Sequence, residues 1–546
     1  MASNIYAEYE NKFKGKHSFK ALLGFNNEQS TYKSLNTSRN GLINDNVQNI
    51  NLALGTAITT AGQYEQWGVR GGFFRLNYGF DERYLLEING RYDGSSKFPN
   101  DKRYAFFPSL SGGWRISKEP FWKLSKNIIS DLKLRASYGS LGNGNIASYT
   151  FMEQFGISQS GRVLGGIRPQ TTSQPNVLPA NLTWEKATTT DIGLDAVFLN
   201  NKLTLGFDWY LRNTTDMFTN GPTLPAVFGA SVPKGNYADL KTKGWEFVAA
   251  WKDRFPLAHK TFNYGVRVTV GDYQSEITKY NNPSQLLSDY YVGQKLGEIW
   301  GYVTDGFFTA ANIGEASKQT LIKSSNSGAT MIGDVKFLDL NGDGVINTGA
   351  NTVSNPGDRR IIGNAQPRYS YSALFDFDWN NFFFSAFFQG VGQQTWWPGA
   401  EADAFWGPYN RPYNRVPTEM VDRIWSDANP DTYFPRLRGY IAQGTGRSLN
   451  VTQTKYLQNV AYIRLKNLQI GYSLPQSLIG RLKLTQAKVY ISADNVWTYS
   501  PMYKVTHNLD VENIQGSDRV LTNGGNGNGQ NYPILKGWTV GLNIGF

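Results

Sequence analysis

Apolar and polar residues alternate along almost the whole chain, and this period of two constrains the fold more than any other feature. Successive side chains of a β-strand point to opposite sides, so each alternating segment predicts a strand with one apolar and one polar face. The clearest example has one face made of Leu203, Leu205, Phe207, Trp209 and Leu211. The same pattern recurs over Tyr84–Tyr92, Trp245–Trp251, Tyr264–Val270 and Tyr371–Trp379.

The number and length of these segments indicate a membrane barrel. There are about fifteen, of roughly 9 to 17 residues each, long enough to span a bilayer when tilted. Aromatic residues make up 14% of the chain, yet mean hydropathy is −0.43 and no run of 18 apolar residues occurs, which excludes a helical membrane protein. A barrel wall combines lipid-facing and lumen-facing positions with aromatic girdles. We therefore predict an all-β, transmembrane antiparallel β-barrel.

The connections between the predicted strands alternate between short and long. The short ones are 14–16, 81–82, 200–201, 253–258, 380–381 and 475–482, with a longer one near 118–129. The long ones are 26–63, 93–103, 142–181, 219–235, 278–367, 391–454 and 500–535. Outer-membrane barrels have short periplasmic turns and long extracellular loops. Taken singly, each strand would suit a soluble sheet; the sorting of the connections favours the barrel.

The last strand, 536–546, carries Trp538, Val540, Leu542, Ile544 and Phe546 on one face. We expect it to be the closing strand, engaged by the barrel-assembly machinery through edge pairing. If the short turns are periplasmic, this strand and the first one, Asn4–Phe13, both run inward. An odd number of strands is then expected upstream, together with a signal peptide, because the sequence opens without an export signal.

Composition and charge narrow the range of functions. The chain has no cysteine, which excludes disulfides, thiolate catalysis and cysteine metal sites. Its net charge of +11 comes from scattered residues rather than from one basic stripe, so a nucleic-acid partner is not expected. The three histidines, His17, His259 and His507, lie far apart and lack metal-site spacing. No catalytic residues are predicted, and the chain is not expected to be an enzyme.

Three stretches resemble the SusC/RagA family of TonB-dependent outer-membrane transporters of Bacteroidetes. The first is RYLLEINGRYDGSSKF at 83–98, followed by YAFFPSLSGGW at 104–114. The second is GDVKFLDLNGDGVIN at 333–347, rejoined by DRRIIGN at 358–364. The third is LKNLQIGYSLP at 465–475, leading to ADNVW at 493–497. Their order and spacing match over nearly the whole chain.

The resemblance implies a barrel of about 22 strands filled by an N-terminal plug that carries a TonB box. Residues 1–546 would then be its C-terminal part, with the plug, TonB box and signal peptide outside this sequence. It also implies outer-membrane import of oligosaccharides or peptides, with a SusD-like surface lipoprotein and the TonB complex as partners. Two alternatives stay open: a passive porin or surface adhesin, and a secreted glycan-binding β-protein.

One segment of the long loop at 278–367 has the spacing of a calcium loop. Asp339, Asn341, Asp343 and Asn347 place oxygen side chains at loop positions 1, 3, 5 and 9, and Gly344 stands at position 6. The backbone carbonyl of Val345 would supply position 7. Position 12 is Ala350, and the resemblance implies that Asp358 takes this place after an insertion. We expect a structural Ca²⁺ here; the alternative is a metal-free turn rich in Asn and Asp.

Aromatic residues gather in the loop that follows Phe388. They are candidates for contact with substrate or with the lid protein: Trp396, Trp397, Phe405, Trp406, Tyr409 and Tyr413. Rings of this kind stack on sugars, but they also pack loops together and bury against partner proteins. Packing or lid contact is the favoured interpretation.

Overall fold

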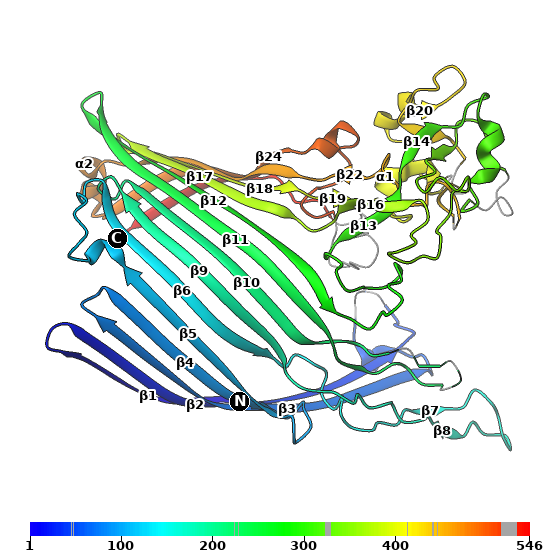
Figure 1. Ribbon diagram of the computed structural model, residues 1–546, viewed down its shortest axis with the longest axis horizontal. Helices are drawn as coiled ribbons and strands as arrows, with labels where there is room; N and C mark the ends of the chain where they lie inside the picture. The colour runs from blue at the N-terminus through cyan, green and yellow to red at the C-terminus, as the bar shows by residue number, and fades with distance from the viewer. Residues whose placement is uncertain are drawn as a thin grey trace. The chain divides into compact units, whose positions relative to one another are not determined.

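The computed structural model describes residues 1–546 except 45, 47, 223, 226, 228, 323–328, 412, 439–441, 445 and 515–531. Fifteen long strands form one antiparallel sheet, and each neighbours the next long strand along the chain (Figure 1). This confirms the predicted fold class and strand number. The strands are β1 (Ala2–Phe13), β2 (His17–Arg39), β3 (Ile58–Phe80), β4 (Tyr84–Ser95), β5 (Tyr104–Arg115), β6 (Ile129–Asn143), β9 (Glu185–Phe198), β10 (Leu203–Asn220), β11 (Lys234–Leu257), β12 (Lys260–Lys279), β17 (Arg368–Trp379), β18 (Phe382–Gln393), β23 (Tyr462–Ser473), β24 (Gln486–Tyr499) and β25 (Gly537–Gly545).

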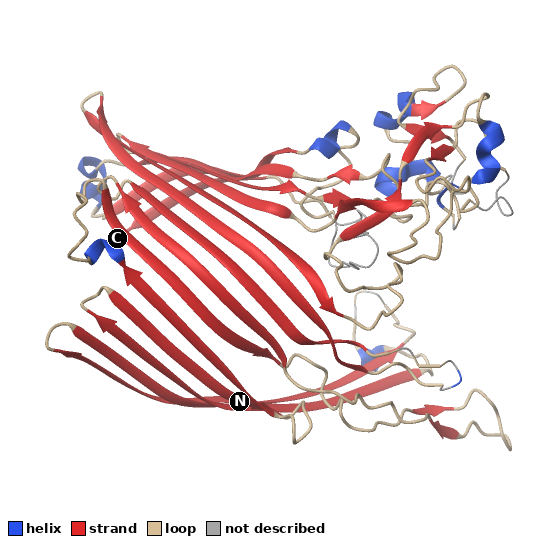
Figure 2. Cartoon of the chain, in the orientation of Figure 1, coloured by secondary structure: helices blue, strands red, loops and turns tan. Residues whose placement is uncertain are grey.

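Helices are few and short (Figure 2). The α-helices are α1 (Asp403–Trp406) and α2 (Gln476–Ile479). The 3-10 helices include η1 (Ile50–Leu52), η2 (Ile116–Lys118), η4 (Ile313–Lys318), η6 (Gly407–Tyr409), η7 (Thr418–Arg423), η9 (Gly480–Leu482) and η10 (Pro501–Lys504). Within the residues that the structure describes, no helix has the length and apolarity needed to cross a membrane.

The tight turns between long strands explain several of the predicted short connections. A hairpin turn of two residues follows the strand twist best when its central residues have positive φ, which Asn, Asp and Gly adopt most readily. Backbone φ is positive at these positions: Lys14, Gly15, Asp81, Glu82, Asn200, Asn201, Ala258, His259, Asn380 and Asn381. Four of these five turns lie where the sequence predicts a short connection. The fifth, at 258–259, comes at the end of the predicted connection 253–258, because β11 continues to Leu257.

The connection between β2 and β3 is shorter than predicted. The sequence indicates a loop over 26–63, whereas the two strands stay paired from His17↔Phe80 to Arg39↔Ile58. Most side chains in the added length are exposed on both faces. A strand needs about 9 to 11 residues to cross a bilayer, so the extra residues need no apolar face while the backbone ladder continues. The alternation that predicts strands is therefore missing there.

Small strands organise the long loops. They form five separate two-stranded sheets among the described residues. The pairs are β7 (Ile157–Gln159) with β8 (Gln170–Thr172), β13 (Glu298–Tyr302) with β16 (Arg359–Asn364), β14 (Thr304–Phe307) with β15 (Val335–Phe337), β19 (Thr395–Trp396) with β22 (Gln458–Asn459), and β20 (Ile424–Trp425) with β21 (Phe434–Arg436). The last of these pairs is parallel.

The described chain divides into two compact units. The first comprises 1–119, 135–191 and 212–240, and the second comprises 120–134, 192–211 and 241–546. The first unit has a small apolar core of Phe98, Phe107, Leu182 and Trp184. The second has a much larger core, which lies in the long loops that follow β12, β18 and β24.

Candidate functional site

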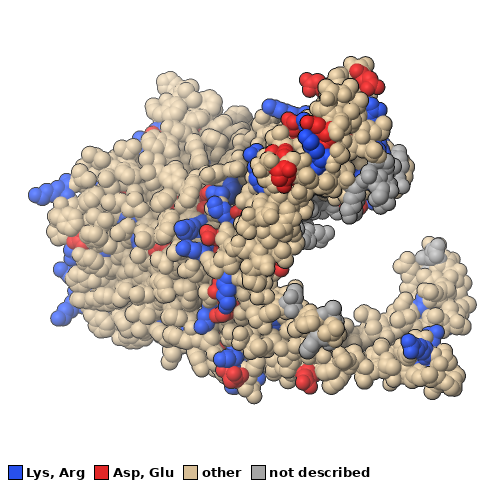
Figure 3. All heavy atoms as spheres, turned by 45° about the vertical axis from the view of Figure 1, so that its right-hand side comes forward, with Lys and Arg blue, Asp and Glu red and all other residues tan. Residues whose placement is uncertain are grey.

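The wall strands of the first unit present one exposed apolar face. Register places Leu76 opposite Ile88, and Ile88 opposite Leu110, so these side chains form a row across β3, β4 and β5. All three are exposed, Leu110 by 49%. Exposed apolar surface of this extent needs a covering, which a bilayer supplies. Figure 3 shows a broad surface with few charged side chains, which gather along its borders.

The intervening positions form a polar face on the same strands. The Arg75 guanidinium donates to the Asn89 side-chain carbonyl at 2.9 Å and lies 3.9 Å from the Glu87 carboxylate. Asn77 and Asn89 both donate to Glu87. On the next pair of positions, Arg91 forms an ion pair with Asp93 at 2.8 Å. A polar face of this kind suits the aqueous interior of a barrel.

A pair of substitutions on β5 tests this assignment of faces. Arginine in place of Leu110, on the apolar face, should lower the free energy of unfolding in bilayers by about 2–4 kcal/mol, because a charge on the lipid side of a barrel is poorly solvated. The neighbouring Ser111 lies on the polar face opposite Glu87, so Ser111→Arg should have little effect. Urea titration followed by heat-modifiable gel mobility measures both. Equal costs for the two variants would contradict the assignment.

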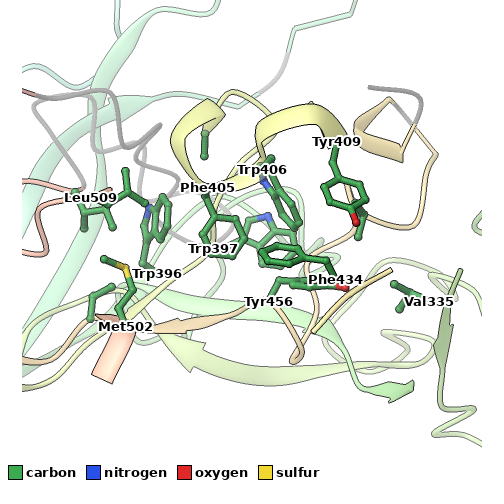
Figure 4. Packing of buried hydrophobic residues seen from close by; sticks show 14 of the residues in the cluster. Val335, Trp396, Trp397, Phe405, Trp406, Tyr409, Phe434, Tyr456, Met502 and Leu509 are labelled. Atoms are coloured by element: carbon green, nitrogen blue, oxygen red, sulfur yellow. The ribbon is translucent and has the colours of Figure 1, made fainter. Parts of the chain in front are cut away.

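The aromatic cluster of the second unit is the largest buried feature of the described chain (Figure 4). Trp396, Trp406 and Tyr409 are 0% exposed, Phe405 is 2% exposed and Trp397 is 3% exposed. Five of the six aromatic residues predicted to contact substrate or lid are therefore buried in this core. The sixth, Tyr413, is 80% exposed and keeps its ring available at the surface. The sequence could not separate these cases, because a ring suits a core and a surface equally.

Hydrogen bonds fix the cluster's polar atoms. The Trp406 indole donates to the carbonyl of Pro398 at 3.0 Å, and the Tyr409 hydroxyl donates to the carbonyl of Pro435 at 2.6 Å. Tyr456 donates to the carbonyl of Tyr433 at 3.1 Å. Burial raises the pKa of Tyr433 to about 12 and also raises the pKa of Tyr409 and of Tyr456. These phenols stay neutral at physiological pH and stabilise the loops.

In the segment from Asp339 to Asp358, both of these carboxylates accept hydrogen bonds from backbone N–H groups of the same segment. Asp339 accepts N–H groups of Gly342 and Gly344 at 2.7 and 2.8 Å, and Asp358 accepts those of Leu340 and Asn347 at 2.9 and 2.8 Å. These backbone bonds, the Gly344 amide first, together with the Asp358 side chain, lower the pKa of Asp339. The carboxyl groups of Asp339 and Asp358 are thus in contact.

The other predicted ligands in this segment face the loop itself. The side-chain oxygens of Asn341, Asp343 and Asn347 accept the backbone N–H groups two residues further along. Bonds of this kind define Asx turns, the metal-free alternative. The Val345 carbonyl accepts weakly from Asn347 at 3.4 Å. No group of three or more His, Cys, Asp or Glu suited to a metal ion occurs within the described residues.

A buried ion network joins the wall to the last long loop. Arg464 of β23 donates to Asp510 and to Glu512 at 2.7 Å each, and Lys466 lies 2.8 Å from Glu512. The side chains of Arg464 and Asp510 are only 4% and 7% exposed. Asp510 also accepts the backbone N–H of Ile534 at 2.9 Å, so it holds both ends of this loop. The sequence analysis missed this network, because nothing in the sequence pairs Arg464 with residues 46 to 48 positions away.

The bulge beside this network contains residues of the third matching stretch. Pairing between β23 and β24 shifts between Leu465 and Asn467, where the side chain of Asn467 donates to Asp494 at 2.9 Å. Across the bulge, Asn495 has a φ of 54° and donates to the carbonyl of Leu535 at 3.2 Å. A β-bulge re-aims side chains in this way. The stretches LKN and ADN therefore shape the wall where the last loop attaches.

Comparison with known proteins gives consistent matches. The family described as TonB dependent receptor-like, beta-barrel matches residues 3–496. TonB-dependent receptor P3 of Formosa agariphila is 28% identical over 560 residues, covering 100% of this chain and 52% of the relative. TonB-dependent receptor SusC of Bacteroides thetaiotaomicron is 27% identical over 497 residues, covering 87% of this chain and 43% of SusC.

Solved structures show the same fold. The structure of the RagAB peptide transporter matches with a TM-score of 0.76 at 22% identity, covering 100% of this chain and 55% of the matched chain. The RagAB peptide importer in its 'open-open' state matches with a TM-score of 0.74 at 21% identity. The chain spans about half the length of the curated relatives it matches.

Proposed function

The chain belongs to the TonB-dependent receptor-like β-barrel family, and on that premise we propose that it serves in nutrient import across the outer membrane. Proteins of this family are outer-membrane receptors and transporters, not enzymes. The observation that carries the proposal is the wall with one apolar and one polar face within a family match over 3–496. Energy from the TonB complex would drive uptake.

The proposed cargo is an oligosaccharide or a peptide. The RagAB peptide transporter, to which the chain is similar, supports the peptide class, and the resemblance to the SusC/RagA family implies both classes. Deleting the gene should abolish growth on one class of cargo supplied as sole carbon source, and a plasmid copy should restore it. A protonophore should stop uptake of the same labelled cargo. Uptake that persists without the proton-motive force would favour the passive porin instead.

We also propose a SusD-like surface lipoprotein as partner, docked on the long loops. The exposed Tyr413, which lies in the same long loop as Trp406, supports this, since aromatic residues are enriched in protein interfaces. Affinity purification of the full-length protein should recover one lipoprotein in stoichiometric amount. Recovery of the transporter alone from mildly solubilised membranes would contradict the partnership.

Assembly is proposed to use β25 as the recognised strand. Its alternate residues are all exposed, from 42% at Ile544 to 93% at Phe546, and present one apolar face. An unpaired edge with this pattern can add to another sheet. Outer-membrane lipid would then cover the apolar face once the wall has formed.

We retain Ca²⁺ binding by the segment from Asp339 to Asp358 as a separate proposal. The order of its oxygen side chains and the contact of Asp339 with Asp358 support it. If Ca²⁺ binds, it should add about 2.7 kcal/mol to the free energy of unfolding at roughly 100 times its Kd, and EGTA should reverse the gain. Differential scanning fluorimetry measures the shift, which Asp339→Asn should abolish. Substituting the remote Asp427, which is 88% exposed, should leave it intact. A melting temperature that does not change with Ca²⁺ would contradict metal binding and favour the metal-free Asx turn.

A further inference from the structure

A cavity of about 570 Å³ opens in the first unit where β4 ends. The last residue pair of β3 with β4 is Val69↔Ser95, and the segment from Ser148 to Met152 lies against β3 beyond that point. The Tyr149 hydroxyl accepts the backbone N–H of Gln66 at 2.9 Å, and Ser96 accepts that of Gly68 at 2.9 Å. These side chains cover the edge of β3 that extends beyond its pairing with β4. The volume of the cavity is within the range of small-molecule sites.

Positive charge dominates the lining. Arg70, Lys97 and Arg103 line the cavity, against the single carboxylate of Glu28. None of these three cations has a carboxylate partner within the part of the chain that the structure describes. The Arg103 Nε–H is buried and has no hydrogen-bond acceptor there. Cations without a carboxylate partner attract a ligand that carries negative charge.

Aromatic rings hold two of these cations in place. The Lys97 ammonium lies 5.4 Å from the centre of the Trp67 ring and donates to the carbonyl of Ile146 at 2.8 Å. The Arg70 guanidinium lies 5.6 Å from the centre of the Tyr104 ring, and its Nε donates to the Tyr104 hydroxyl at 2.6 Å. Each cation still has free N–H groups for a ligand, because an ammonium has three and a guanidinium five.

The rest of the lining suits a sugar. Trp67 and Tyr149 add aromatic rings to the lining, and the side-chain amides of Asn27, Gln29 and Gln66 offer both donors and acceptors. Rings can pack against the apolar face of a sugar, while amides bond its hydroxyl groups. A purely inorganic anion would use neither. We propose that this cavity binds an acidic saccharide, a sugar that bears a phosphate, sulfate or carboxylate group.

The acidic saccharide has two possible sources, which share this chemistry. Arg70 and Tyr104 lie on the same face as Ile88, because Gly94 is paired with both of them in the register. That face is apolar, so the charged sugar head of an outer-leaflet glycolipid could reach the cavity. A soluble acidic oligosaccharide could reach it from the loop side, since the cavity lies at the strand ends opposite the short turn at 81–83. The inference does not depend on the import function, because binding is measured without transport.

The test uses the full-length protein in detergent, with lactose monosulfate as the soluble probe and unmodified lactose as the neutral control. Isothermal titration measures both, and native mass spectrometry measures retention of added diphosphoryl lipid A. The double variant Arg70→Met/Lys97→Met should weaken binding of an acidic probe by roughly 10- to 100-fold, since two charge-assisted hydrogen-bond donors are lost. The variant Lys97→Met alone should give an intermediate loss. Lys102→Met, on the same loop but outside the lining, should change binding less than about twofold.

The results distinguish a soluble saccharide from a glycolipid, and two results would overturn the proposal. Binding of lactose monosulfate that depends on Arg70 and Lys97 supports a soluble saccharide, and equally dependent retention of lipid A alone supports a glycolipid. Lactose bound as tightly as its sulfated form would overturn the proposal. So would acidic binding that is unchanged in the double variant while its heat-modifiable gel mobility matches the parent protein.

Discussion

Replacing Trp406 with alanine should lower the stability of the loop core by about 3–5 kcal/mol, the usual cost of removing a large buried ring. Trp406 is 0% exposed and packs between Phe405 and Tyr456, with ring centres 4.8 and 5.2 Å away. Removing its indole leaves a cavity that stiff neighbouring rings cannot fill, and it leaves the carbonyl of Pro398 without this donor. Hydrogen–deuterium exchange of amides in 395–410 measures the loss directly.

The matched control is Tyr413→Ala, since Tyr413 comes from the same loop and is 80% exposed. Its truncation should leave exchange in 395–410 within error of the parent protein. Phe377 of β17 does not belong to the aromatic cluster, and amides of that strand should be unaffected by either change. If Trp406→Ala exchanges no faster than Tyr413→Ala, the aromatic cluster is not the element that holds these loops.

Replacing Arg464 with methionine should cost about 3–5 kcal/mol, because it leaves the buried carboxylate of Asp510 without its counter-charge. Glu512 keeps its ion pair with Lys466. Methionine keeps the volume of the side chain but donates no hydrogen bond. Asp510 binds both Arg464 and the Ile534 backbone, so its displacement should release residues on both sides of 515–531 together. Limited proteolysis of the purified protein should then cut within 500–535 far faster than in the parent.

A double-mutant cycle isolates this ion network. Asp510→Asn removes the charge that Arg464 neutralises, so the combined variant should be less destabilised than the sum of the two single variants. Lys466→Met is the milder comparison, because the Lys466 side chain is 22% exposed and touches only Glu512 of the network. Strict additivity between Arg464→Met and Asp510→Asn would show that their contact contributes nothing to the anchoring of the loop.

The wall could be predicted from the sequence because its physical requirements are local. Successive side chains of a strand such as β10 face lipid and barrel interior in turn, so apolar and polar residues alternate in its sequence. Turns such as Asn200–Asn201 and Asn380–Asn381 carry residues that tolerate positive φ. The parts of β2 and β3 far from their short flanking turns, 26–39 and 58–63, were not predicted as strands. Most side chains there are exposed on both faces, so apolar and polar residues need not alternate.

The loops could be predicted far less well, because their contacts join residues that are distant in the sequence. The rings of Trp406 and Tyr456 are in contact although the two residues are 50 positions apart in the sequence. No local sequence pattern distinguishes such a buried ring from an exposed one such as Tyr413. The ion network of Arg464 likewise depends on register and on a bulge. The assignment of Asp358 to the last position of the calcium-loop pattern came only from the resemblance and stays a prediction, since the carboxylates of that segment bind its own backbone.

The short connections and the long loops are expected to lie on opposite sides of the outer membrane. The chain contains no cysteine, so single cysteines can be placed at Tyr413 in a long loop and at Leu478 in the short connection between β23 and β24. These positions are 80% and 55% exposed, so both are open to a reagent. In intact cells, a membrane-impermeant maleimide should label Tyr413→Cys at once and label Leu478→Cys only after the outer membrane is permeabilised. Equal labelling of both positions in intact cells would contradict the account.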